Sequence, residues 1–105
     1  MKQIFIDEFV VPSNSVETFL ARMEYNRAFI SKLSGFIKDN VYQRFDENGN
    51  IIYITIAEWQ DETSLTQAKI AVLAEYKRIN FDPQKMMTNL GIDMKRGIFT
   101  EIISK

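Results

Sequence analysis

The segment ENGNIIYITIAEWQDETSL, residues 47–65, contains the signals that decide the fold. Its Asn48-Gly49 pair separates two runs rich in β-branched and aromatic residues, which is the strongest short-range signal for a β-hairpin. The second run, residues 51–59, ends at Trp59, the only tryptophan of the chain. Asp61 then predicts the N-cap of a helix. We therefore expect a hairpin that leads directly into a helix, with the largest side chain at their junction.

The segment before the hairpin predicts a strand and a helix. Residues 3–11, QIFIDEFVV, are rich in strand-forming residues, and Pro12 ends the run. We expect Asn14 to cap the helix, in a capping box with Glu17. Gly35 ends the helix in a left-handed conformation. The residues expected on its buried face are mostly apolar and lie at helical spacing: Val16, Phe19, Leu20, Met23, Arg27, Ile30 and Leu33.

The segments on either side of the second helix complete the set of elements. Residues 36–46 predict the first strand of the hairpin. Asp82-Pro83 predicts the start of a short third helix that ends at Gly91, and residues 92–103 predict a last strand. The second helix has an apolar stripe at Leu65, Ala68, Val72, Tyr76 and Ile79, flanked by Ile70 and Leu73.

The order β-α-β-β-α-short α-β is that of a ferredoxin-like α+β fold in one domain, residues 1–105. This fold has a four-stranded antiparallel sheet with its helices on one face, and it places the first and third strands at the centre. The third strand is apolar on both faces, with Ile52, Ile54 and Ile56 on one of them. Helices cover only one face, so the other needs a partner, and we expect a homodimer with two sheets face to face.

The composition excludes several classes of function. The net charge of −1 provides no basic surface for nucleic acid, and residues 51–59 lack the pattern of an RNA-binding strand. No apolar run reaches the ~20 residues of a membrane span, so we expect a cytoplasmic protein. The chain has no cysteine and no histidine, which removes thiol nucleophiles, Ser-His-Asp triads and the usual zinc, iron and haem ligands. We expect no metal site.

Three stretches carry a resemblance to a known family: FLARMEYNRAFISKLSGF (19–36), ITIAEWQDETSLTQAKIAV (54–72) and GIDMKRGIFTEI (91–102). The chain resembles the antibiotic biosynthesis monooxygenases, a branch of the dimeric α/β-barrel proteins, over nearly its whole length. The resemblance implies a cavity between helices and sheet in which an electron-rich phenol, hydroquinone or anthrone reacts with molecular oxygen without flavin or metal. The protein would supply a dry cavity, a proton acceptor and donors for the developing oxyanion.

The resemblance implies two catalytic residues, Trp59 and Thr55. Trp59 matches the tryptophan of the family's third strand, while Thr55 stands where anthrone-oxidising members have an amide and donates only one hydrogen bond. Leu65 stands where those members have a tyrosine, so their catalytic set is incomplete here. Haem-degrading relatives need a second tryptophan and a histidine that residues 61–79 lack. We expect no cofactor.

Four more residues are candidates for contact with a small aromatic substrate: Tyr53, Asn26, Tyr76 and Met86. Tyr53 shares a strand face with Trp59, Asn26 is polar among bulky neighbours, and the Tyr76 hydroxyl needs a partner on a buried stripe. Met86 belongs to an adaptable methionine cluster. Ordinary packing is the simpler explanation for each tyrosine and for Met86, and a solvated helix face is the simpler one for Asn26. Trp59 is either a packing residue or part of the cavity wall.

Asp7 and Glu8 place one carboxylate on each face of the first strand. The buried one is either a catalytic base or the ion-pair partner of Lys95 or Arg96 in the last strand. Two functions remain open. The first is a cofactor-independent monooxygenase, and the second is a non-catalytic dimer of the same fold that binds a small apolar ligand or has a structural or stress-related role.

Overall fold

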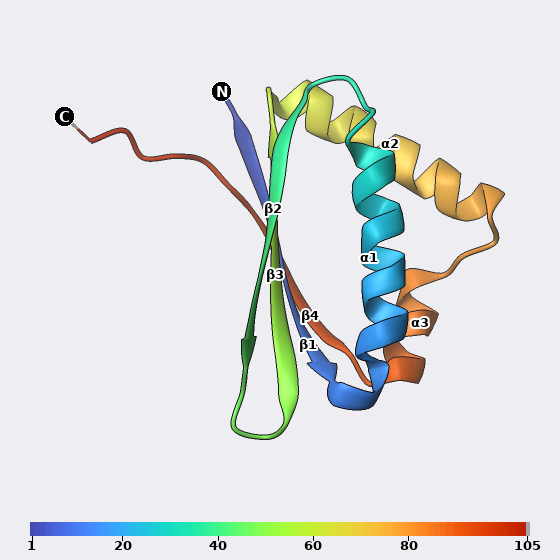
Figure 1. Cartoon of the computed structure of the whole chain (residues 1–105). Helices are drawn as coiled ribbons and strands as arrows, with labels where there is room; N and C mark the ends of the chain where they lie inside the picture. Colours follow the sequence, from blue (N-terminus) through green and yellow to red (C-terminus); the bar gives the residue numbers. More distant parts are fainter. Residues whose placement is uncertain (105) are drawn as a thin grey trace.

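A computed structural model describes residues 1–104 and contains a four-stranded antiparallel sheet with all its helices on one face (Figure 1). The strand order is β2-β3-β1-β4, so the first and third strands are central and the second is an edge, as predicted. The elements are β1 (Gln3–Pro12), the 3-10 turn η1 (Ser13–Ser15), α1 (Val16–Ile30), β2 (Phe36–Phe45), β3 (Asn50–Trp59), α2 (Glu62–Arg78), α3 (Pro83–Leu90) and β4 (Asp93–Phe99).

Local hydrogen bonds set most of these boundaries. The Asp61 carboxylate accepts the Ser64 N–H at 2.7 Å and begins α2, and Asp82 accepts the Lys85 N–H at 3.1 Å and begins α3. Each bond satisfies a helix N–H that has no partner within the helix. The hairpin turns through Gly49, whose φ is +81°. The predicted caps of α2 and α3 and the predicted hairpin are therefore confirmed.

Three predicted boundaries are wrong. α1 ends at Ile30, and Gly35 has the predicted left-handed backbone, with φ of +84°, but lies five residues beyond the helix. Asn14 does not cap α1: it lies inside η1, and the residue before α1 is Ser15, whose side chain makes no capping bond. The buried Ser15 hydroxyl instead donates to the Leu90 carbonyl oxygen at 2.8 Å, joining the start of α1 to the end of α3. The last strand ends at Phe99 rather than at residue 103, because its partner β1 begins near Ile4, which pairs with Phe99.

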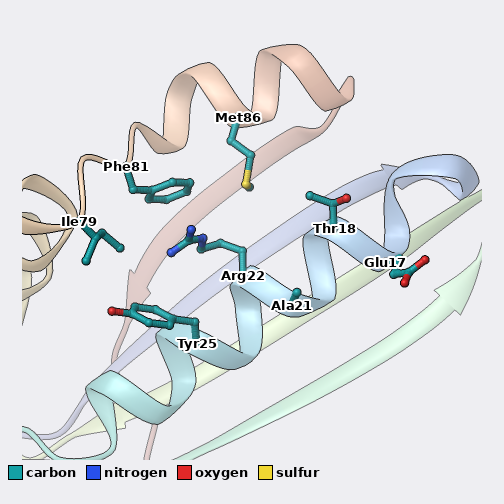
Figure 2. A pocket seen from close by; sticks show the side chains of 8 residues that line it. All are labelled: Glu17, Thr18, Ala21, Arg22, Tyr25, Ile79, Phe81 and Met86. Carbon is teal, nitrogen blue, oxygen red and sulfur yellow. The ribbon is translucent and has the colours of Figure 1, made fainter.

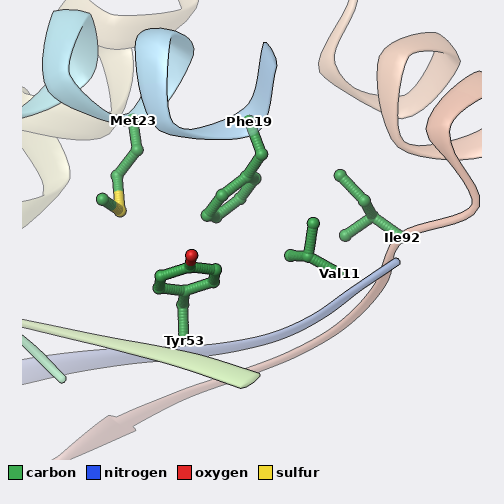
Figure 3. Packing of buried hydrophobic residues seen from close by; sticks show 5 residues of the cluster. All are labelled: Val11, Phe19, Met23, Tyr53 and Ile92. Carbon is green, nitrogen blue, oxygen red and sulfur yellow. The ribbon is translucent and has the colours of Figure 1, made fainter. Parts of the chain in front are cut away.

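The core has two parts on the helical face of the sheet. Figure 3 shows the first, in which Tyr53 of β3 points toward Phe19 and Met23 of α1, with the two aromatic ring centroids 5.2 Å apart. This first cluster consists of Val11, Phe19, Met23, Tyr53 and Ile92. The second cluster joins the start of α2 to the end of β3 and consists of Ala57, Trp59, Leu65 and Ala68.

The opposite face of the sheet carries no helix (Figure 1). The strand register places an apolar stripe of β1 and β3 there, interrupted by Glu8 of β1, with mostly polar residues on the outer strands. Its members are Ile4, Ile6, Val10, Ile52, Ile54 and Ile56. The two long helices thus cover only one apolar face, as the sequence predicted. Within residues 1–104, no helix combines the length and apolar character that crossing a bilayer requires.

Candidate functional site

A cavity of about 440 Å³ lies between the helices and the sheet, in contact with both core clusters. It exists because α2 packs on the sheet only at its start: Leu65 and Ala68 are buried, and the helix then slopes away from β3 (Figure 1). The sheet contributes Phe5, Asp7, Phe9, Asp39, Thr55, Ile56, Ala57, Trp59, Met94 and Arg96. The main helical contributors are Arg22, Met23, Asn26, Arg27, Leu65, Ala68, Lys69, Val72, Tyr76, Met86 and Met87.

The two residues predicted to be catalytic both line this cavity. Trp59 is 2% exposed and packs edge-on against Phe36, with ring centroids 5.5 Å apart, while another part of its surface faces the cavity. Thr55 lies on the same face of β3 and is partly buried. Trp59 is therefore at once a core residue and a wall of the cavity, because it lies at the junction of β3 and α2.

Three of the four predicted substrate contacts reach the same cavity: Asn26 from α1, Tyr76 from α2 and Met86 from α3. Burial raises the pKa of Tyr76, and nearby Arg96 and Asn26 partly offset this effect. Tyr53 is placed elsewhere. It is 3% exposed beneath Phe19 in the first core cluster and is not among the residues that line the cavity. The register of β3 puts Tyr53 on the correct face, but α1 covers it.

An ion pair between β1 and β4 lies on the floor of the cavity. The Arg96 guanidinium donates two hydrogen bonds to Asp7, from Nε to Oδ1 at 2.7 Å and from a terminal nitrogen to Oδ2 at 3.0 Å. Asp7 is buried, whereas the Arg96 side chain is half exposed. The hydrogen bond to Asp7 raises the pKa of Arg96. Asp7 was expected to be either a catalytic base or an ion-pair partner, and in the structure it forms the ion pair. Arg96 has further N–H groups that Asp7 does not use and that could bind a ligand.

A second ion pair joins α1 to β2, where Asp39 pairs with Ala57 of the second core cluster. Arg27 Nε donates to Asp39 Oδ2 at 2.7 Å, and this bond raises the pKa of Arg27. Arg27 stood on the stripe predicted to be buried, and its partner explains how a cation is accommodated there. Both Arg27 and Asp39 line the cavity.

A larger hollow, of about 760 Å³, lies on the outside between α1 and the segment leading into α3 (Figure 2). It shares three residues with the cavity: Arg22, Phe81 and Met86. At one end, the Tyr25 hydroxyl donates to Glu75 on α2. Hydrogen bonds from Arg78 and Tyr25 lower the pKa of Glu75 to about 2.

The sequence predictions missed three cations of the cavity: Arg22, Lys69 and, as a cavity residue, Arg96. Helical spacing offered a signal for Arg22, because it precedes Asn26 by four residues and so shares its helix face. Lys69 follows the buried Ala68 on α2, and periodicity alone places it at the edge of the apolar stripe. Within residues 1–104, no group of three acidic, histidine or cysteine side chains could hold a metal ion.

The sequence matches no protein-family model, and no curated protein matches it. Solved structures do match. A variant of SnoaB, a cofactor-independent oxygenase from Streptomyces nogalater, is 23% identical, with a TM-score of 0.67 over 98% of this chain and 95% of that one. The chain shares the fold of this oxygenase.

Two further solved structures agree. A dimeric ferredoxin-like protein from an uncultured marine organism is 12% identical, with a TM-score of 0.70 over 99% of this chain and 98% of that one. A protein from Nitrosomonas europaea, provisionally named an antibiotic biosynthesis monooxygenase, has the same identity and TM-score over 96% and 90% of the two chains. The predicted ferredoxin-like fold is confirmed.

Proposed function

We propose that this chain is a cofactor-independent monooxygenase of the antibiotic biosynthesis monooxygenase type, acting on a small electron-rich aromatic compound. The observation that carries the proposal is the cavity itself: it is large enough for a bicyclic ring and is lined mainly by aromatic, aliphatic and methionine side chains, with a few polar groups. Trp59 and Thr55, the two residues that match or replace catalytic positions of the resembled family, both line it.

The proposed reaction needs little from the protein beyond this environment. In an anthrone, the ring methylene loses two hydrogens and gains one oxygen atom of O₂, and the second oxygen atom leaves as water with those hydrogens. The substrate supplies the electrons once it is deprotonated. Arg96, held in place by Asp7, would stabilise the resulting oxyanion, and Thr55 and the Trp59 indole would donate hydrogen bonds to it. Asn26, Tyr76 and Met86 would hold the ring, and Tyr53 would pack beside the cavity in the first core cluster.

We also propose that the chain forms a homodimer through the helix-free face of the sheet. Six aliphatic side chains of β1 and β3 lie on this face around Glu8, and an apolar surface of this extent is rare on monomers. A two-fold axis would pair the stripe with its own copy. The solved structure of a dimeric ferredoxin-like protein with the same fold supports this arrangement.

Oxygen consumption with hydroquinones, naphthols and anthrones tests the proposed reaction. Saturable uptake above autoxidation is expected for the wild type, with a loss in Trp59→Phe and Thr55→Val, which alter the cavity with little change in volume. Phe45→Ala removes an aromatic ring that is 73% exposed and lies outside the cavity, so it should leave uptake unchanged. No uptake by the folded wild type would favour the alternative, a dimer that binds a small apolar ligand without turnover.

A further inference from the structure

Arg22 is the one arginine of the cavity whose charge has no carboxylate partner within residues 1–104. Arg27 is paired with Asp39, and Arg96 is paired with Asp7. Glu17 lines the outer hollow with Arg22 but forms no ion pair with it. A partly buried guanidinium normally finds an anion, so a ligand anion is the natural partner here.

Aromatic side chains hold the Arg22 guanidinium in place. Its central carbon lies 3.9 Å from the centroid of the Phe81 ring and 5.2 Å from that of Tyr25. Figure 2 shows the group extending from α1 into the space between these two rings. Phe81 is itself packed edge-on against Tyr76, with centroids 5.0 Å apart. Stacking occupies the faces of the guanidinium and leaves its in-plane N–H donors free.

The charge of the cavity favours the same kind of ligand. Its lining carries four cations, Arg22, Arg27, Lys69 and Arg96, against two carboxylates, Asp7 and Asp39. Lys69 also makes no ion pair within the described part of the chain and lies 5.7 Å from the Phe5 ring centroid. The cavity is therefore positive in a chain whose net charge is −1.

We propose that the cavity binds an aromatic carboxylate, with the ring between helices and sheet and the carboxylate at Arg22. This inference rests on the proposed function, because it names the substrate class of the same cavity. Arg22, Phe81 and Met86 line both the cavity and the outer hollow, so the carboxylate lies at the boundary between them. The planar fork of N–H donors matches the two oxygens of a carboxylate, and a phenol oxygen offers only one acceptor atom.

Calorimetric titration with 2-naphthoate and with 2-naphthamide, its neutral isostere, tests the inference without requiring turnover. The wild type should bind the acid about tenfold more tightly, as expected for hydrogen bonds to a charged group. Arg22→Met replaces the guanidinium by an unbranched apolar side chain. It should abolish the preference for the acid and leave the affinity for the amide unchanged. Arg22→Lys keeps the charge and should retain part of the preference. Lys32→Met removes an exposed cation outside both hollows and should retain all of it.

Three results would overturn the inference. Equal binding of acid and amide by the wild type would mean that the cavity takes neutral aromatics, which leaves the proposed oxygenase intact. An Arg22→Met protein that is folded by circular dichroism and keeps the preference would place the anion elsewhere. Binding of neither compound would remove the aromatic cavity site itself, and the proposed function with it.

Discussion

Replacing Gly35 by alanine should destabilise the protein more than the same change at Gly49. Both glycines have left-handed backbones, with φ of +84° and +81°. A methyl group at Gly49 would have no neighbouring atom within 4 Å, whereas one at Gly35 would overlap the Ser64 side chain in the first turn of α2. The same region is fixed by the Gln60 N–H, which donates to the Gly35 carbonyl oxygen at 2.8 Å. Gly35 thus sets how closely α2 approaches the sheet.

The magnitude follows from these two contributions. The left-handed conformation costs an alanine about 1–2 kcal/mol at either position. Overpacking at Gly35 adds about 1–3 kcal/mol, because either Ser64 or the start of α2 must move. We therefore expect a loss of about 1–2 kcal/mol for Gly49→Ala and about 2–5 kcal/mol for Gly35→Ala.

Urea unfolding, at one protein concentration because a dimer's stability depends on it, measures both values. A double-mutant cycle isolates the overlap: Ser64→Gly should recover part of the loss in the Gly35→Ala protein, with a coupling energy of about 1 kcal/mol or more. Equal losses at Gly35 and Gly49, or no coupling with Ser64, would refute the role assigned to the overlap.

Three other perturbations test the packing, the charges and the assembly. Leu65→Ala should cost about 2–4 kcal/mol of unfolding free energy in urea, whereas Ile70→Ala, at a side chain that is 57% exposed, should change it by less than about 0.5 kcal/mol; similar losses would contradict the burial pattern of α2. Hydrogen bonds from Arg78 and Tyr25 lower the pKa of Glu75 from 4.5 to about 2, so the stabilisation by ionised Glu75 is complete above pH 4.5 and is lost as the pH falls toward 2. Glu75→Gln should therefore flatten the dependence of the unfolding free energy on pH in this range. An unchanged pH dependence would show that these hydrogen bonds do not stabilise the fold. Ile54→Glu on the helix-free face should give a monomer by light scattering, whereas Leu73→Glu on α2 should leave the dimer intact. A dimeric Ile54→Glu protein would show that the interface lies on another surface.

The part of the site that could be predicted lies on single elements. The alternation of side chains along β3 places Thr55 and Trp59 on one face of the sheet. The helical periodicity of α1 and α2 places Asn26 and Tyr76 on the helix faces that point toward the sheet. Alternation also placed Tyr53 on the face of Thr55 and Trp59, but it did not predict that Tyr53 stays outside the cavity. Whether a strand residue lines a cavity depends on which helix lies above it. The sequence narrowed the ion-pair partner of Asp7 to Lys95 or Arg96 of β4. The register between β1 and β4 selects Arg96, which lies directly opposite Asp7.

The sequence by itself determined the order of the elements, the hairpin, the two aspartate caps and the four-stranded antiparallel sheet, because each depends on periodicity, on turn residues or on caps within a few residues. Only the tertiary structure decided that a cavity exists and that Arg22 stacks on Phe81 beside it. Both follow from the direction in which α2 leaves the sheet after Leu65 and Ala68. That direction is set by contacts between residues far apart in the chain, such as Gly35 with Ser64 and Tyr25 with Glu75, which no local pattern encodes.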